Sequence, residues 1–305
     1  MTIRPSIVIC TYDRYDVLPL CLEALSADVA SSAGGVEVLI VDNTPPAKRR
    51  EVDLFDDFKL HIADRPGLSN ARNIGVRETS GDVIVFLDDD ATVHPGFISA
   101  LKTGFDRAPQ AMVMGGKTVP AFPDATPPAW FSDKLLGYLS CIDLGAELRP
   151  LKQGEFVVGA NVAFRREVFD KHGLFDVALG RTGSKHLLSN EEIELLHKVG
   201  LDYVFYNPHQ AVDHHIPAGR LSAQWFRKRV YWQAISDLVG DLTYITLKDA
   251  LSEYGALQMR LPPEKRGLGF LHAEPGSPEE MQTQMRLIYL SALFAAEGFP
   301  PLADG

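Results

Sequence analysis

A chain of 305 residues is long enough for one large α/β domain with a smaller helical appendage. Its composition, 46% hydrophobic and 23% charged, is that of an ordinary globular protein and excludes extensive disorder. The formal charge of −10 argues against a nucleic-acid-binding protein, because phosphate recognition depends on an excess of Lys and Arg.

The first part of the chain alternates strand and helix patterns. Short apolar runs typical of buried strands lie at residues 6–10, 36–42, 58–63 and 83–87. Helical periodicity follows the first run from about Leu18, and it recurs after the third run at residues 68–79. Strands that alternate with helices predict a Rossmann-like α/β fold with a mostly parallel sheet covered on both faces.

Further along the chain the predicted elements are shorter. We expect a helix at 95–108, a strand at 112–119, a proline-rich loop or lid at 121–130, a strand and short helix within 156–169, a glycine-rich loop at 173–189, a helix at 190–199, and strands at 203–207 and 211–215. From residue 222 the periodicity is helical, interrupted at 261–278. These patterns predict a catalytic domain over residues 1–220 and a helical region over 221–305.

Polar residues follow the ends of three predicted strands. They lie at 11–14, at Asp42 with Asn43, and at 88–90. One such cluster would be an ordinary polar loop, but three at the same edge of a parallel sheet favour a ligand site, since α/β folds bind ligands where strands end.

Three consecutive aspartates, Asp88, Asp89 and Asp90, end the fourth strand and require a cation nearby, because like charges so close repel. As a metal site they would hold Mg²⁺ or Mn²⁺, which leave coordination positions open for a diphosphate. An alternative is the nucleophile motif of a haloacid-dehalogenase-type phosphohydrolase, which Asp88, Asp90 and Thr92 resemble. That family usually places the motif on the first strand, whereas here it follows the fourth.

Two adjacent acids, Glu191 and Glu192, begin the helix predicted at 190–199. Ser189 with Glu192 fits a capping box, and acids in a first helical turn are favoured by the helix dipole. Two neighbouring acids cannot both cap, so a general base is a second interpretation. His214 is, in the same way, either a structural hydrogen-bonding residue or a further metal ligand.

Other motifs narrow the range of functions. The run GGKT at 115–118 lacks the first glycine of a phosphate loop, and no GxGxxG follows the first strands, so nicotinamide and flavin cofactors have no support. Three cysteines without metal-binding spacing indicate buried thiols in a reducing compartment. With no secretory leader and no apolar run of roughly eighteen residues, we expect a cytoplasmic protein without a membrane span.

Taken in order, the runs SIVICTYDR, IVDN, GLSNARNIG, FLDDDATVHPGF, GANVAFRREVF, GLFD, EEIELL and VDHHIPAGR resemble family 2 glycosyltransferases with the nucleotide-diphospho-sugar-binding A-type fold. The resemblance spans residues 6–220. It implies an inverting, metal-dependent transfer of one sugar from a nucleotide-diphospho-sugar, with a UDP-sugar as the first choice, to an acceptor hydroxyl.

The resemblance also implies which residues bind the donor. Thr11, Tyr12 and Arg14 would contact the base and ribose, and Tyr12 could stack on a pyrimidine. Asp42 would contact the base, and Arg72 would lie near the nucleotide.

The aspartate run would then hold the metal. By the same resemblance, Asp88 and Asp89 would contact the ribose and the metal. Asp90 would be a direct ligand of Mn²⁺ or Mg²⁺, and His214 would complete the metal site.

Catalysis would fall to Glu192 or Glu191, which occupy the place of the family's Glu-Asp pair. Because the second member here is Glu rather than Asp, the choice between the two stays open, as does a catalytically silent sugar-nucleotide binder. Asn161 and the loop around Arg181 would face the acceptor.

The acceptor itself could be a small molecule, a glycan or a lipid-linked sugar. The Q-x-x-R-W signature of processive synthases is incomplete, since Lys228 follows Arg227, which favours the transfer of a single sugar. The helical region could form a homodimer face.

Overall fold

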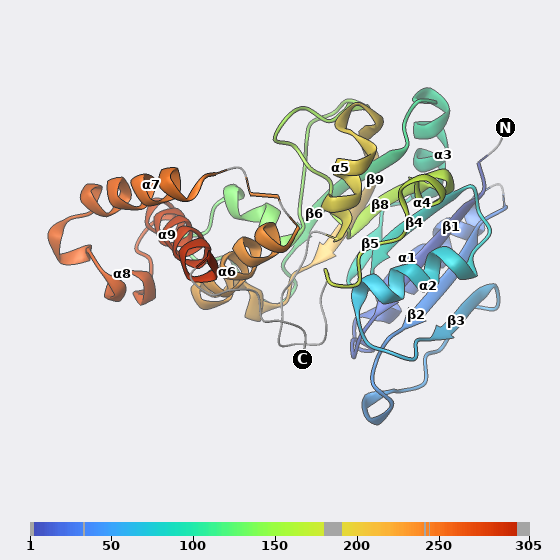
Figure 1. Cartoon of the computed structure of the whole chain (residues 1–305). Coiled ribbons are helices and arrows are strands. Elements are labelled where there is room, and N and C mark those ends of the chain that lie inside the picture. The colour runs from blue at the N-terminus through green and yellow to red at the C-terminus, as the bar shows by residue number, and fades with distance from the viewer. Residues whose placement is uncertain (1–2, 33, 180–190, 241, 244, 298–305) are drawn as a thin grey trace.

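A computed structural model describes residues 3–32, 34–179, 191–240, 242–243 and 245–297 (Figure 1). Within these residues a nine-stranded sheet has the order β3-β2-β1-β4-β8-β6-β9-β5, with β7 paired to β9. Helices flank the sheet, and a group of helices from the end of the chain lies beside it (Figure 1). The predicted α/β class is therefore confirmed.

The first half of the sheet is parallel, as predicted. Its elements are β1 Pro5–Thr11, α1 Leu18–Ser31, β2 Glu37–Asp42, the 3₁₀ turn η1 Pro46–Lys48, β3 Phe58–Ile62, α2 Leu68–Glu78 and β4 Val83–Asp88. Strand β1 pairs with β2 on one side and with β4 on the other. The register sets Thr11 opposite Asp42 and Cys10 opposite Asp88, so the polar ends of these strands lie at one edge.

The second half of the sheet mixes strand directions. Its elements are β5 Ala91–Val93, α3 Phe97–Arg107, β6 Val113–Ala121, β7 Arg149–Pro150, β8 Asn161–Arg165, α4 Arg166–His172, α5 Glu191–Val199, η3 Leu201–Tyr203 and β9 Val204–His215. Strand β8 runs antiparallel to both β4 and β6, and β9 is parallel to β6 but antiparallel to β5. Parallel pairing therefore holds for the first four strands and for β6 with β9.

Strand β9 joins the two strands predicted at 203–207 and 211–215. Its pairing with β6 shifts register between Gly116 and Thr118, where residues 208–211 find no partner on β6. Pro208 lies in this bulge, which suits a residue without a backbone donor. The sequence pattern predicts the two stretches of β9 that pair with β6, but not that they form one continuous strand.

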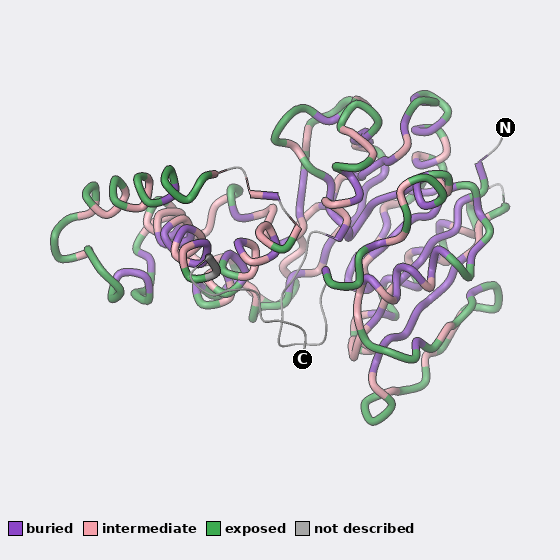
Figure 2. Tube along the Cα trace, in the orientation of Figure 1, coloured by how far each residue is buried: buried purple, intermediate pink, exposed green. Residues whose placement is uncertain are grey.

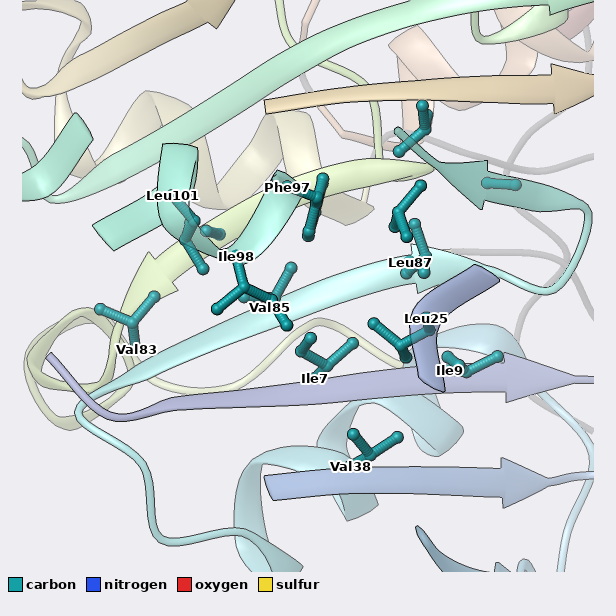
Figure 3. Packing of buried hydrophobic residues seen from close by; sticks show 14 of the residues in the cluster. Ile7, Ile9, Leu25, Val38, Val83, Val85, Leu87, Phe97, Ile98 and Leu101 are labelled. Atoms are coloured by element: carbon teal, nitrogen blue, oxygen red, sulfur yellow. The ribbon is translucent and has the colours of Figure 1, made fainter. Parts of the chain in front are cut away.

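Apolar side chains alternate between the two faces of the sheet. Ile7 and Ile9 belong to the same buried cluster as Leu25 and Phe97, on the α1 and α3 face (Figure 3). Val8, between them in sequence, joins the cluster on the opposite face. This period of two produces a sheet buried on both sides, and each fully buried Val or Ile stabilises the fold by about 1.5–3 kcal/mol.

The last part of the chain is helical, as predicted. Its elements are η4 Ala218–Leu221, α6 Ala223–Val239, α7 Leu247–Arg260, η5 Pro263–Lys265, α8 Leu268–His272 and α9 Pro278–Glu297. Helices α6 and α9 pack on η2 Asp133–Leu139 through a third core that includes Trp130, Leu135, Phe226 and Met281, while α7 and α8 pack on α9 through a smaller cluster that includes Phe270, Leu271 and Leu287. Figure 2 shows the exposed outer surface of α7 beyond this core. The division at residue 220 stays a prediction.

None of the helices in the described part of the chain has the length and apolar content needed to cross a membrane.

Candidate active site

The aspartate run lies in the turn between β4 and β5. Asp88 ends β4, and Asp89 and Asp90 follow with less than a tenth of their surface exposed. Thr11, at the end of β1, donates a hydrogen bond from Oγ1 to Asp89 Oδ2 at 2.7 Å. We call Asp88, Asp89, Asp90 and the neighbouring His214 the acid cluster.

Three cationic side chains surround Asp90. Arg14 Nη2 lies 2.7 Å from Oδ2, and Arg220 Nη2 lies 3.7 Å from the same oxygen. His214 Nε2 lies 3.0 Å from Oδ1. Arg14 Nε also lies 3.6 Å from Asp89 Oδ1. The counter-ion that the sequence required is therefore shared among two arginines and a histidine.

These contacts separate the pKa values of the two buried aspartates. Burial raises the pKa of Asp89, and the charge on Asp90 raises it further, to about 7. Burial also raises the pKa of Asp90, but His214 and the two arginines outweigh it and hold that pKa far below its usual value. Burial lowers the pKa of His214, whereas the Asp90 charge raises it to about 10.

The donor set of the acid cluster fits a divalent cation. One ligand atom each from Asp88, Asp90 and His214 lie within 4.8 Å of one another. His214 Nδ1 lies 2.9 Å from the Leu139 carbonyl oxygen, which can only accept, so Nδ1 carries a proton and Nε2 faces the aspartates. The two carboxylates suit Mn²⁺ or Mg²⁺, and the imidazole favours Mn²⁺ of the two, because Mg²⁺ prefers oxygen ligands.

A second polar group lies where β1 and β2 end. Asp42 is fully buried and accepts hydrogen bonds from Tyr15 Oη at 2.7 Å and from the Thr44 amide at 2.9 Å. Tyr12 is partly exposed beside Asp13, whose φ of 54° lies in the left-handed region that Asp tolerates. The structure thus brings Thr11, Tyr12 and Asp42 to one edge of the sheet.

A buried ion pair lies near this edge. Arg72 Nη1 contacts Glu191 Oε1 at 2.6 Å and Glu192 Oε2 at 3.8 Å. The guanidinium lies over the rings of Phe86 and Phe175, 5.6 and 5.7 Å from their centroids. Burial lowers the pKa of Arg72, but the charges of Glu191, Glu192 and Asp88 raise it above its usual value. Arg72 is therefore stabilised as a cation both by the glutamates and by the aspartate run.

Gly159 holds the other side of the glutamates. Its amide donates to Glu192 Oε1 at 3.2 Å, and its carbonyl accepts from Arg72 Nη2 at 3.3 Å. A Cβ at this position would lie 2.3 Å from Arg72 Nη2, so a larger residue here would displace the guanidinium. The side chain of Glu191 is 3% exposed and that of Glu192 is 16% exposed, so Glu192 is the more accessible carboxylate.

One predicted site residue has its side chain turned into the sheet, although its backbone lies opposite Leu87, next to the aspartate run. Asn161 is fully buried, and its amide donates to the carbonyls of Lys117 and Gln210 while Oδ1 accepts from Gln210 Nε2. The expectation that Asn161 faces the acceptor is therefore wrong, because its side chain bridges the β6–β9 bulge. The predicted acceptor loop around Arg181, and Ser189 of the predicted capping box, lie outside the described residues.

The GGKT run also has a structural explanation. A Cβ on Gly116 would lie 1.9 Å from the Gln210 carbonyl oxygen. The second glycine therefore permits the close approach of β6 and β9, in agreement with the rejection of a phosphate loop.

Sequence reasoning missed Arg220 and Tyr15. Arg220 ends the run VDHHIPAGR, which also contains His214. Its place in the same run as a predicted metal ligand was the signal that could have indicated a role at the site. Tyr15 lies just beyond TYDR, but nothing local to its sequence indicates a bond to Asp42.

Comparison with known proteins identifies the class. The model of the glycosyl transferase family 2 matches residues 6–173, which include the aspartate run but not the glutamates or His214. A glucosyl-dolichyl phosphate glucuronosyltransferase of Haloferax volcanii is 31% identical over 261 residues, 82% of each chain. The succinoglycan biosynthesis protein ExoM of Rhizobium meliloti is 27% identical over 238 residues, 75% of this chain and 72% of its own.

A solved structure agrees in fold. GalNAc-T7, crystallised with UDP, GalNAc and Mn²⁺, superposes with a TM-score of 0.53 at 15% identity and covers 98% of this chain and 58% of its own. The sheet, the acid-bearing strand ends and these similarities define an A-type glycosyltransferase that uses a nucleotide-sugar. The chain belongs to glycosyl transferase family 2. This membership removes the support for the phosphohydrolase alternative.

Proposed function

We propose that this glycosyltransferase moves a single sugar from a UDP-sugar to an acceptor hydroxyl, with inversion at the anomeric carbon and with a divalent cation. The observation that carries the proposal is the acid cluster, in which ligand atoms of Asp88, Asp90 and His214 lie within 4.8 Å of one another. The presence of UDP and Mn²⁺ in the GalNAc-T7 crystals supports the same pairing of nucleotide and metal.

The nucleoside would bind where β1 and β2 end. Asp42, whose carboxylate already accepts from Tyr15 Oη and the Thr44 amide, would accept from the N–H of uracil. Tyr12 is partly exposed and would pack on the pyrimidine ring. Thr11, Asp88 and Asp89 would contact the ribose. Arg72 is buried against Glu191, so we assign it to the glutamates rather than to the nucleotide.

Asp88, Asp90 and His214 would hold Mn²⁺ or Mg²⁺. Beside Asp90 the raised pKa of about 10 keeps His214 protonated on both ring nitrogens, so His214 would release its Nε2 proton to solvent as it binds the cation. When bound there, the cation would stabilise negative charge on the departing diphosphate. The Leu139 carbonyl keeps the proton of His214 on Nδ1 and orients Nε2 toward the site.

Glu192 would act as the general base. Its carboxylate is held by the Gly159 amide and by Arg72, and it is more exposed than Glu191. It would take the proton from the acceptor hydroxyl while that oxygen attacks the anomeric carbon and the bond to the diphosphate breaks. A single displacement of this kind inverts the configuration of the sugar.

The sugar and the acceptor are chosen by parts of the pocket that local sequence does not specify. The Haloferax relative is named for glucuronosyl transfer to glucosyl-dolichyl phosphate, so UDP-glucuronic acid with a lipid-linked glucoside is the first pair to test. UDP-glucose, UDP-N-acetylglucosamine and GDP-mannose complete a donor panel.

The test is release of nucleotide from each donor, with Mn²⁺ or with EDTA, followed by NMR of the product anomer. We expect release that requires the cation and the acceptor, and a product whose anomeric configuration is opposite to that of the donor. Turnover that persists in EDTA, or a retained configuration, would contradict the proposal. Donor binding without turnover would support a catalytically silent binder.

A further inference from the structure

The acid cluster is neutralised in this structure by side chains from two loops. Arg14 lies in the turn after β1, and Arg220 belongs to η4, between β9 and the helical region. Both contact Oδ2 of Asp90, at 2.7 and 3.7 Å. Their side chains are 27% and 16% exposed, whereas that of Asp90 is 3% exposed. Each arginine therefore has a buried partner but can itself reach solvent.

The same carboxylate is a proposed metal ligand. A divalent cation at Asp90 would lie a few ångströms from both guanidiniums, and charges of the same sign at that distance repel strongly. A cation and both arginines therefore cannot share Asp90 at low cost. Binding of the cation should therefore weaken the ion pairs that Asp90 makes with Arg14 and Arg220.

The donor offers the released arginines a new partner. A nucleoside diphosphate carries oxygens that guanidinium groups bind in a bidentate geometry. The chain as a whole has a formal charge of −10, so an anionic donor needs local cations to approach this edge. Arg14 and Arg220 are the two arginines that contact the aspartates of the acid cluster within the described ranges.

We propose that Arg14 and Arg220 are exchangeable counter-ions. They pair with Asp90 in the free protein, leave it when the divalent cation binds, and then bind the phosphate oxygens of the donor. This inference rests on the proposed function, since it needs a cation at Asp90 and a diphosphate beside it. Its consequence is that cation alone binds weakly, and that cation and nucleotide strengthen each other's binding.

The test compares Arg14→Gln and Arg220→Gln with the unmodified protein in two binding measurements. Electron paramagnetic resonance of free Mn²⁺ gives the affinity for the cation without nucleotide, which should rise on the order of threefold to tenfold because a competing charge is gone. Calorimetry with UDP at saturating Mn²⁺ should show affinity weakened by about tenfold, because a charged hydrogen bond to phosphate is lost.

Two controls make the result specific. Arg4→Gln removes an arginine that pairs with Asp82 at 3.1 Å, at the opposite end of β1 and β4, and should change neither affinity. Arg14→Lys keeps the charge, so its Mn²⁺ affinity should stay near that of the unmodified protein, while its UDP affinity should fall because lysine lacks the guanidinium fork.

The outcomes separate this inference from the proposed function. Opposite shifts, tighter Mn²⁺ and weaker UDP, support the exchange. Parallel losses in both affinities would indicate a merely structural role and overturn it, as would two unchanged affinities. If neither the unmodified protein nor any variant binds Mn²⁺, the metal site itself is wrong and the exchange falls with it.

Discussion

Two carboxylate groups lie close to the same edge of the sheet, and they are neutralised in different ways. Asp90 is paired with Arg14 and Arg220, which come from loops and reach solvent. Glu191 is paired with Arg72, which is 4% exposed and lies against the rings of Phe86 and Phe175. The first arrangement allows partners to change, and the second fixes a charge in place. One site thus combines exchangeable and permanent counter-ions.

The largest effect should follow from breaking the permanent pair. Arg72→Met leaves Glu191 buried without its arginine, which typically costs about 3–5 kcal/mol. Urea denaturation would measure the loss of unfolding free energy. The double variant Arg72→Met/Glu191→Met should recover much of it, because the buried carboxylate that lost its arginine is then gone as well.

The matched control is Arg65→Met, since the Arg65 side chain is 80% exposed and should contribute little. A loss below about 1 kcal/mol for Arg72→Met would mean that the pair is not the fixed element described above.

The next effect concerns the two glutamates within that group. Glu192→Gln should lower kcat by at least about a hundredfold, because a general base is lost, while UDP affinity stays near normal. The comparison with Glu191→Gln sharpens the assignment, since Glu191 is held by Arg72 at 2.6 Å and should act through position and stability. Steady-state kinetics and UDP calorimetry measure both. Near-normal turnover in Glu192→Gln would move the role to Glu191.

A smaller effect should follow from loosening the acid cluster. Thr11→Val removes the hydroxyl that donates to Asp89 Oδ2 at 2.7 Å, and a hydrogen bond to a charged group contributes about 1.5–3 kcal/mol. Urea denaturation of the metal-free protein at pH 9, where Asp89 with its raised pKa of about 7 is charged, should show a loss in that range. Thr92→Val is the matched control, because Thr92 Oγ1 makes only a 3.4 Å contact with a backbone carbonyl and a 3.1 Å contact with His215. Equal losses of unfolding free energy in both variants would show that the hydrogen bond to Asp89 contributes no more than the contacts of Thr92.

Local patterns predicted most of the elements but not all of their directions. The strands β1, β2, β3 and β4 follow from apolar runs, because burial on both faces leaves a continuous signal. The antiparallel entry of β8 between β4 and β6 left no such signal, since a side-chain pattern reads the same for either direction. Strand β5 has only three residues and lies directly after the aspartates, so periodicity could not reveal it.

The same limit applies to the site. The aspartates are adjacent in sequence, so their repulsion, and hence the need for a cation, could be inferred directly. The identity of the cations could not be inferred from the sequence, because the partners are far apart along the chain. Arg14 and Asp90 are separated by 76 residues, and Arg72 and Glu191 by 119 residues. The placement of Asn161 failed for a related reason, since the bulge that it bridges is formed by strands from distant parts of the chain.

The most direct test of the account is an anomalous difference map from crystals grown with Mn²⁺ and UDP. We predict one strong manganese peak within bonding distance of Asp88, Asp90 and His214, with the diphosphate of UDP beside it. A map with no peak at these residues while UDP is bound, or with UDP held away from the ends of β1 and β4, would contradict the central claim.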